Sequence, residues 1–439
     1  MSRSLIKSFF LFSNSLLINN EFKKILKNFN WLAIEGIFNK LISFLATIYV
    51  AKYLGPDQFG LLNYSISYFT LISFIATLGL RRITIRELVL NNNRNEILGT
   101  TFFSQIIAGT ICFLFILLSF NFLNKDHDSH ILIIIISFTL FFQPFEVIDY
   151  FFQSNLSNSK IVKVKIISVF FVSSLKILFV LLNLPIIFFA ASFTAIWLIN
   201  AIGFISLAHK ENINILDWKL DKKIALTLLK DSWPLILSAG MIQIYARVDQ
   251  IMIKEILGNA ELGYYSIAVR FTEAFYFIPT VIITTVFPKF IEYRKMNYSR
   301  YLNRLQQFYI LISWISIFIG LIIFFSSNFI IDFLFGDIYD SSIDVLKIYI
   351  FSLYATSAGL ASSQYLLAEN YTRVSFYRTF LGMILNVFLN LLLIPLYGIE
   401  GAAWTTFISY LVATYSLLLF KKTRRQGIML IKSIFFIKK

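Results

Sequence analysis

Twelve long apolar runs, separated by short polar connections, follow one another along the chain. A helix needs about 20 mostly apolar residues to cross a bilayer core, and each run meets that length. The runs are 31–53, 59–80, 97–120, 131–152, 161–182, 186–208, 233–256, 262–288, 305–326, 343–367, 374–396 and 399–420. Only 14% of the 439 residues are charged, whereas soluble domains have about 25%. The pattern predicts an all-α integral membrane protein with twelve transmembrane helices.

The polar connections alternate sharply in their content of Lys and Arg. One set consists of the N-terminus, 81–96, 153–165, 209–230, 289–304, Arg373 with Arg378, and the C-terminal tail, and it holds 31 of the 39 Lys and Arg residues. The other set holds only Lys52, Lys125, Lys254 and Lys347. Because cytoplasmic loops retain positive charge, we expect both termini to be cytoplasmic. The net charge of +15 then serves orientation and contact with membrane lipids, and no nucleic-acid partner is expected.

Several protein classes are excluded by simple motifs. Residues 1–30 are basic with a short apolar run but lack a small-residue cleavage site, so we expect an amphipathic segment at the cytoplasmic surface rather than a signal peptide. The single cysteine, Cys112, excludes a disulfide framework and a cysteine metal cluster. No phosphate-binding glycine loop of the G-x-x-x-x-G-K-[ST] type occurs. Neither a metal nor a cofactor is therefore expected, and an ion gradient or a partner supplies any energy that is needed.

An internal repeat divides the chain into two parts. Leu54-Gly-Pro-Asp-Gln-Phe-Gly60 returns 203 residues later as Leu257-Gly-Asn-Ala-Glu-Leu-Gly263, Tyr150–Asn155 returns as Tyr365–Asn370, and Leu181–Pro185 returns as Leu391–Pro395. With six helices in each copy, both copies enter the membrane from the same side, which predicts two parallel repeats around a central cavity. We place the halves at 1–220, with the amphipathic N-terminal segment, and 221–439, with a basic cytoplasmic tail.

Polar residues follow one face of several apolar runs. Gln243, Arg247, Gln250 and Lys254 recur at steps of four, three and four, and Ser266, Arg270 and Glu273 share a face of the next run. A rise of ~1.5 Å per residue places Lys40, Arg247, Arg270 and Glu273 in one central slab of the membrane. A charge at that depth is costly unless it faces protein, water or substrate. We therefore predict substrate binding by Lys40, Gln243, Arg247, Gln250 and Arg270.

Three carboxylates are candidates for ion coupling, namely Glu35, Asp249 and Glu273. Burial would raise their pKa values toward neutrality and let them exchange protons. Asp249 lies ~200° around its helix from Arg247, so it belongs to a different face. The structural alternative, in which these charges pair and hold the helices together, stays open. For the two arginines it is disfavoured because a structural pair has opposite signs, and because a guanidinium suits phosphate.

The sequence resembles a known transporter family. Arg247-Val-Asp-Gln-Ile-Met-Ile, Leu257-Gly258, Gly263-Tyr-Tyr-Ser-Ile-Ala268, Arg270, Pro279 and the earlier Leu54–Gly60 motif carry the resemblance, which is to the polysaccharide-transport family of lipid-linked oligosaccharide flippases. That family belongs to the exporter superfamily that also contains multidrug-and-toxin extruders and the peptidoglycan-precursor flippase.

The resemblance implies a multi-pass protein of the bacterial inner membrane. It would move a polyprenyl-pyrophosphate-linked sugar repeat unit to the outer leaflet for O-antigen, capsule or exopolysaccharide assembly. It further implies coupling to H+ or Na+ and partnership with a polysaccharide polymerase and a chain-length regulator.

Two other functions fit the sequence less well. A multidrug or organic-cation antiporter would use the same scaffold, but it calls for an acidic cavity, whereas the polar faces here are more basic than acidic. A membrane polymerase or ligase commonly uses a long external loop with arginines and histidines, whereas the connections 121–130 and 327–342 are short and acidic. A transporter without enzymatic activity is the preferred interpretation.

Overall fold

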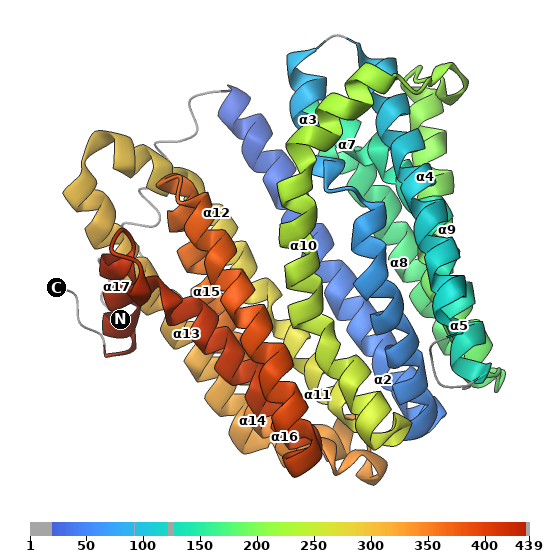
Figure 1. Ribbon diagram of the computed structural model, residues 1–439, viewed down its shortest axis with the longest axis vertical. Helices are drawn as coiled ribbons and strands as arrows, with labels where there is room; N and C mark the ends of the chain where they lie inside the picture. The colour runs from blue at the N-terminus through green and yellow to red at the C-terminus, as the bar shows by residue number, and fades with distance from the viewer. Residues whose placement is uncertain (1–19, 92, 122–126, 436–439) are drawn as a thin grey trace.

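The described part of the chain is a helical bundle (Figure 1), known from a computed structural model that describes residues 20–91, 93–121 and 127–435. The N-terminal half of the chain, from α2 to α9, lies beside the C-terminal half, from α10 to α17. The predicted amphipathic segment lies mostly outside the described residues, and α2 begins at Asn20. The all-α membrane fold predicted from the apolar runs is confirmed.

The helices have the following bounds. They are α2 (Asn20–Ala76), α3 (Leu80–Leu90), α4 (Arg94–Ser119), α5 (His127–Ser137), α6 (Thr139–Phe142), η1 (Gln143–Glu146), α7 (Val147–Ser154), α8 (Asn158–Leu181), α9 (Ile186–Lys210), η2 (Ile215–Asp217), α10 (Lys222–Leu257), α11 (Asn259–Phe275), α12 (Phe277–Met296), α13 (Tyr298–Leu334), η3 (Asp337–Tyr339), α14 (Ser342–Tyr349), α15 (Ser352–Ala368), α16 (Thr372–Tyr415), η4 (Ser416–Leu419) and α17 (Arg424–Ile434).

Two helices contain a turn within their bounds. α2 passes through Gly55 at φ 66° and α16 through Gly398 at φ 60°, a region that glycine adopts without steric cost. Within the described residues, nine helical segments are long and apolar enough to cross a membrane, and Glu35–Leu90 and Thr372–Leu419 each contain one of these turns. The polar-striped α10 is not among the nine. The protein is thus a multi-pass membrane protein, and the count of twelve spans stays a prediction.

The sequence repeat is also a repeat in space, and two glycines make it visible. A Cβ atom on Gly60 would lie 1.8 Å from the backbone oxygen of Asn259, and one on Gly263 would lie 2.0 Å from the backbone oxygen of Pro56. Both contacts connect positions related by the 203-residue offset, because Pro56 corresponds to Asn259 and Gly60 to Gly263. The two turns therefore pack against each other as a near-symmetric pair, and we call this the glycine end of the molecule.

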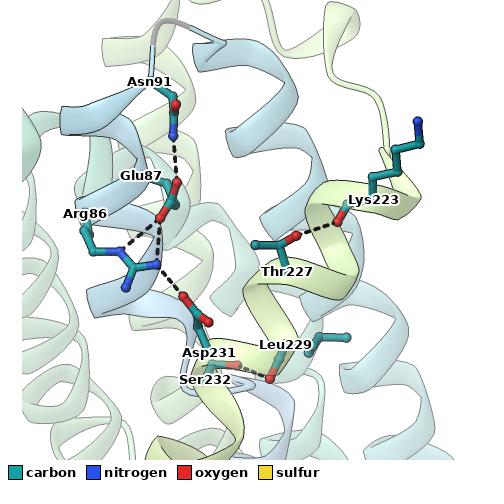
Figure 2. Close-up of polar contacts among 8 residues, drawn as sticks. All are labelled: Arg86, Glu87, Asn91, Lys223, Thr227, Leu229, Asp231 and Ser232. Carbon is teal, nitrogen blue, oxygen red and sulfur yellow. Dashed lines mark hydrogen bonds and ion pairs between the residues drawn. The ribbon is translucent and has the colours of Figure 1, made fainter.

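The opposite end carries the basic connections and joins the halves differently. At this basic end, Arg86 of α3 donates to both Glu87 and Asp231, and Asp231 belongs to the first turns of α10 (Figure 2). A Cβ on Gly240 of α10 would lie 2.7 Å from the Phe74 ring of α2. The first half of α10 thus packs on the N-terminal half, although the predicted boundary assigns it to the C-terminal half. That boundary, 220/221, stays a prediction.

The basic tail is not a free extension in its described part. α17 packs against α13, where the side-chain amide of Gln306 donates to the Met429 carbonyl at 3.0 Å and that of Gln426 donates to the Tyr309 hydroxyl at 2.7 Å. Leu430 is fully buried in this contact. The tail therefore forms part of the C-terminal half.

A substitution tests the glycine contact. Gly263→Ala should place a methyl group against the Pro56 backbone, which cannot move as a flexible side chain does, so the thermal midpoint of the purified protein should fall, with a destabilisation of about 1–3 kcal/mol. Gly36→Ala is the matched control because nothing lies within 4 Å of a Cβ there. Thermal unfolding of both variants is measured by circular dichroism. Equal midpoints for the two variants would contradict the close approach.

Candidate functional site

The face of α10 that carries the predicted stripe meets α11 and the second part of α2. Arg247 forms an ion pair with Glu273 of α11 at 3.2 Å. The side chains remain 19% and 28% exposed, so the pair borders an accessible space rather than a sealed core. Arg247 and Glu273, predicted to share a depth in the membrane, are direct partners. The ion pair neutralises Arg247 in part, as the structural alternative expects.

Arg270 has a different environment. Its guanidinium donates from Nε and Nη2 to the Asn63 side-chain oxygen of α2 at 3.3 and 3.0 Å, and no carboxylate of the described residues lies within ion-pair distance. Arg247 is close enough to repel it electrostatically and Glu273 to attract it. Arg270 is thus held by a neutral acceptor that belongs to the other half of the molecule.

Two lysines add to this positive region. Lys40 of α2 is exposed and interacts electrostatically with Glu273. Lys176 of α8 is half-buried and interacts with Arg270. Neither lysine has an ion pair with a described residue. We call Lys40, Lys176, Arg247 and Arg270 the cation cluster. Among the described residues, Glu273 is the one carboxylate that forms an ion pair with a member of this cluster.

Lys176 was missed in the sequence because it is an isolated charge in the run 161–182. A signal existed in the charge count: 35 of the 39 Lys and Arg residues belong to polar connections or their flanks, and the other four are the members of the cation cluster. Buried like charges repel, and each costs about 2.5–3.5 kcal/mol at bilayer depth on insertion scales. Such a group is best stabilised by an anion or by water.

The remaining polar residues of the stripe lie at the contact between the halves. The Ser67 hydroxyl donates to the Gln250 side-chain oxygen at 2.6 Å, the Tyr64 hydroxyl donates to Glu255 at 3.0 Å, and the Lys254 ammonium lies 4.6 Å from the centre of the Tyr64 ring. We call this contact of residues 56–76 with α10 and α11, including Asn63–Arg270, the seam. Gln250 is 2% exposed there, whereas Gln243 is half-buried on the same face. Substrate binding by both glutamines stays a prediction.

Among the described residues, Asp249 forms no ion pair with the cation cluster, although Arg247 lies within electrostatic reach of it. Asp249 is 2% exposed and accepts hydrogen bonds from the Tyr265 hydroxyl, from the Gln250 backbone N–H at 2.8 Å and from the Thr406 hydroxyl at 3.5 Å. Within the described residues it forms no ion pair. A buried carboxylate held only by neutral donors is costly in its charged form, so this position suits exchange of a proton or a small cation.

Glu35 belongs to a separate network in the N-terminal half. The Lys165 ammonium of α8 lies 2.8 Å from Asp149 of α7 and 3.7 Å from Glu35 of α2, and Arg81 lies 3.8 Å from Asp149. The Asp149 side chain is only 2% exposed, so it is held by these basic partners rather than solvated near the end of its helix. Of the three carboxylates predicted to couple ions, Glu35 and Glu273 thus have basic partners and Asp249 has none.

No metal-ligand cluster is found, as far as the described ranges reach: none of them brings three or more His, Cys, Asp or Glu side chains together in a way that could hold a metal ion.

The chain also matches known proteins. A family model described as "Polysaccharide biosynthesis protein" matches residues 25–294, more than half of the chain. The chain belongs to this polysaccharide biosynthesis family. A second family model, described as MatE, matches residues 234–392.

Relatives of this polysaccharide biosynthesis family member agree in fold. Capsular polysaccharide biosynthesis protein CapF of Staphylococcus aureus is 22% identical over 90% of this chain and 99% of its own length. The structure of the lipid II flippase MurJ in an inward closed conformation has a TM-score of 0.71 at 18% identity, covering 92% of this chain and 90% of that one. An inward-facing multidrug resistance MATE family transporter has a TM-score of 0.70 at 14% identity, covering 90% and 96%. The resemblance and the exporter fold inferred from the sequence are confirmed.

The Arg247–Glu273 pair can be tested apart from transport. Glu273→Gln should leave the Arg247 guanidinium without its partner in a mostly buried position and destabilise the protein by about 1–3 kcal/mol. The double variant Arg247→Gln/Glu273→Gln removes both charges and should recover most of that loss. Thermal unfolding in detergent measures both, and additive losses in the double variant would argue against a direct pair.

Proposed function

We propose that the protein is a flippase that moves a polyprenyl-pyrophosphate-linked oligosaccharide repeat unit from the cytoplasmic to the outer leaflet of the bacterial inner membrane. The cation cluster is the observation that carries the proposal. Arg270, Lys40 and Lys176 have no ion pair among the described residues. Lys176 interacts electrostatically with Arg270, and Lys40 and Arg270 both interact with Glu273. A pyrophosphate supplies several acceptor oxygens and the opposite charge, and arginine binds phosphate by charge-assisted hydrogen bonds.

The scaffold supports an alternating-access mechanism. The halves, taken as 1–220 and 221–439, meet at the seam near the glycine end. Both halves contribute to the cation cluster, with Lys40 and Lys176 from the first and Arg247 and Arg270 from the second. Because loops rich in Lys and Arg are retained in the cytoplasm, we infer that the basic end and both termini lie there. The substrate then enters from the basic end, and rocking of the halves opens the glycine end to the outside. Sugars occupy the space between the halves while the polyprenyl tail remains in lipid.

We infer that Asp249 couples this motion to H+ or Na+. It has no basic partner among the described residues, unlike Glu35 and Glu273. Nearby, on facing turns of α16, Asn386 donates to the Ser409 hydroxyl at 3.2 Å, and the side-chain oxygens of Asn390 and Thr405 are buried without a hydrogen-bond partner. Neutral and anionic oxygens in a buried site are ligands suited to a small cation, and the carboxylate alone suffices for a proton.

A multidrug or organic-cation antiporter shares this fold, and the MatE match to the second half is compatible with it. The charge of the site argues against that function. The cluster contains four cations, and Glu273 is the carboxylate that pairs with one of them in the described structure. An organic cation would be repelled by this excess of positive charge. The lipid-linked anion is therefore the better substrate class.

The arginines provide the direct test. Arg247→Ala/Arg270→Ala should abolish export of the glycan in cells while the protein remains inserted in the membrane, so the lipid-linked intermediate should accumulate on the cytoplasmic side. The control is Arg300→Ala/Arg304→Ala, which removes two exposed arginines near the start of α13 and should leave export intact. Full export by the Arg247/Arg270 variant would overturn the site. Drug resistance conferred without glycan export would favour the antiporter.

Ion coupling is tested with Asp249→Asn in proteoliposomes. The variant should still bind a polyprenyl pyrophosphate, because Asp249 forms no ion pair with a described member of the cation cluster, but transport should no longer respond to an imposed H+ or Na+ gradient. The gradient to which the parent responds identifies the ion. Glu35→Gln is the comparison. If Glu35→Gln loses the response to the gradient while Asp249→Asn keeps it, the coupling site belongs to the N-terminal half instead.

A further inference from the structure

Asn63 is a buried polar residue of a membrane-spanning segment, and the proposed transport cycle gives it no role. It is 2% exposed on α2, and its side-chain amide donates to the Phe59 carbonyl one turn earlier at 2.8 Å. That bond fixes the orientation of the amide group. Its oxygen therefore points away from its own helix and toward Arg270.

The contact leaves part of the arginine free. Asn63 occupies the edge of the guanidinium formed by Nε and Nη2. The other edge has no hydrogen-bond partner among the described residues, while Lys176 and Arg247 lie within electrostatic reach. A guanidinium has five donors in a rigid fork, so one edge can be held while the other binds two oxygens of an anion.

We propose that Asn63 is a positioning residue that makes the phosphate site depend on closure of the seam. Asn63 comes from the first half and Arg270 from the second, so their contact exists only while the seam is closed. In that state Arg270 presents its free edge next to Lys176. When the seam opens, Arg270 loses its fixed orientation and the site loses affinity for the phosphate. This inference rests on the proposed function. It adds a reason why the protein would bind the phosphate tightly while it is open to the cytoplasm and release it when it opens to the outside.

Thermodynamic linkage makes the proposal reciprocal. If closure of the seam strengthens anion binding, then the bound anion must favour closure by the same factor. A reporter in the seam therefore detects the ligand even when no transport occurs.

The first measurement is binding of farnesyl pyrophosphate to the full-length protein in detergent, by calorimetry. Asn63→Leu removes the acceptor and should weaken binding about tenfold, which corresponds to the loss of one hydrogen bond to a charged group. The matched control is Ser65→Ala on the same helix, because Ser65 is fully buried and donates only to the Leu61 carbonyl of its own helix at 2.9 Å. That variant should bind as the parent does.

The second measurement is thiol labelling at position 266. Ser266 is 1% exposed and lies on the face of α11 between Gly263 and Arg270, both of which contact residues 56–76. Ser266→Cys in a Cys112→Ala background gives a single reporter thiol. Farnesyl pyrophosphate should slow its labelling several-fold in the parent and have no effect in Asn63→Leu. Asn63→Asp should protect the thiol even without the probe, because a carboxylate would hold Arg270 more strongly.

The outcomes separate the two proposals. If farnesyl pyrophosphate binds with a requirement for Arg270, but Asn63→Leu binds it equally well and labelling does not respond, the role of Asn63 is wrong and the flippase proposal stands. If Arg270→Ala binds the probe as well as the parent does, or the parent does not bind it, the phosphate site itself is wrong and the role of Asn63 falls with it.

Discussion

A group of positive charges inside a membrane, with too few negative partners, is the constraint on which the rest of this structure depends. Arg247 pairs with Glu273, but in the described part of the chain Arg270 is held only by the neutral oxygen of Asn63. Desolvation and mutual repulsion both disfavour this arrangement. It is stable when the cations border an accessible space, as the partial exposure of Arg247 and Glu273 indicates, and more stable still when an anion occupies that space. The proposed substrate class rests on this charge excess rather than on the helical scaffold, because one fold can serve many substrates.

α10 connects the separate parts of the molecule. At the basic end it is tied to α3 through Asp231 and Arg86. Further along, Arg247 pairs with Glu273 of α11, and Asp249 is buried against Tyr265, one of the earlier residues of the same helix. Gln250 belongs to both regions, since its backbone N–H donates to Asp249 while its side chain accepts from Ser67 across the seam. Gln250 thus connects Asp249 to the seam, and the proposed ion coupling would have a short physical route to the contact between the halves.

The sequence predicted what depends on helical spacing and missed what depends on tertiary packing. Steps of three and four placed Arg247 on the face that meets Glu273, and the same geometry separated Asp249 from it. Lys176 was missed because a lone charge in an apolar run has no periodicity to reveal it. Nothing local in the sequence indicates that Lys165 reaches Asp149 from another helix. The pairing of Ser67 with Gln250, 183 residues apart, likewise has no local signal.

The repeat explains why the site needs both halves. At the 203-residue offset, Ser67 and Ala46 of the first half correspond to Arg270 and Asp249 of the second, so the second half has charges where the first has neutral groups, whereas Asn63 corresponds to the neutral Ser266. The first half contributes instead an oriented acceptor and two lysines from other positions. Neither half alone surrounds an anion. Because the two halves contribute different residues, the proposed anion site is complete only when the halves are in contact at the seam. Separation of the halves would therefore by itself lower the affinity for the anion, and no additional conformational change would be needed.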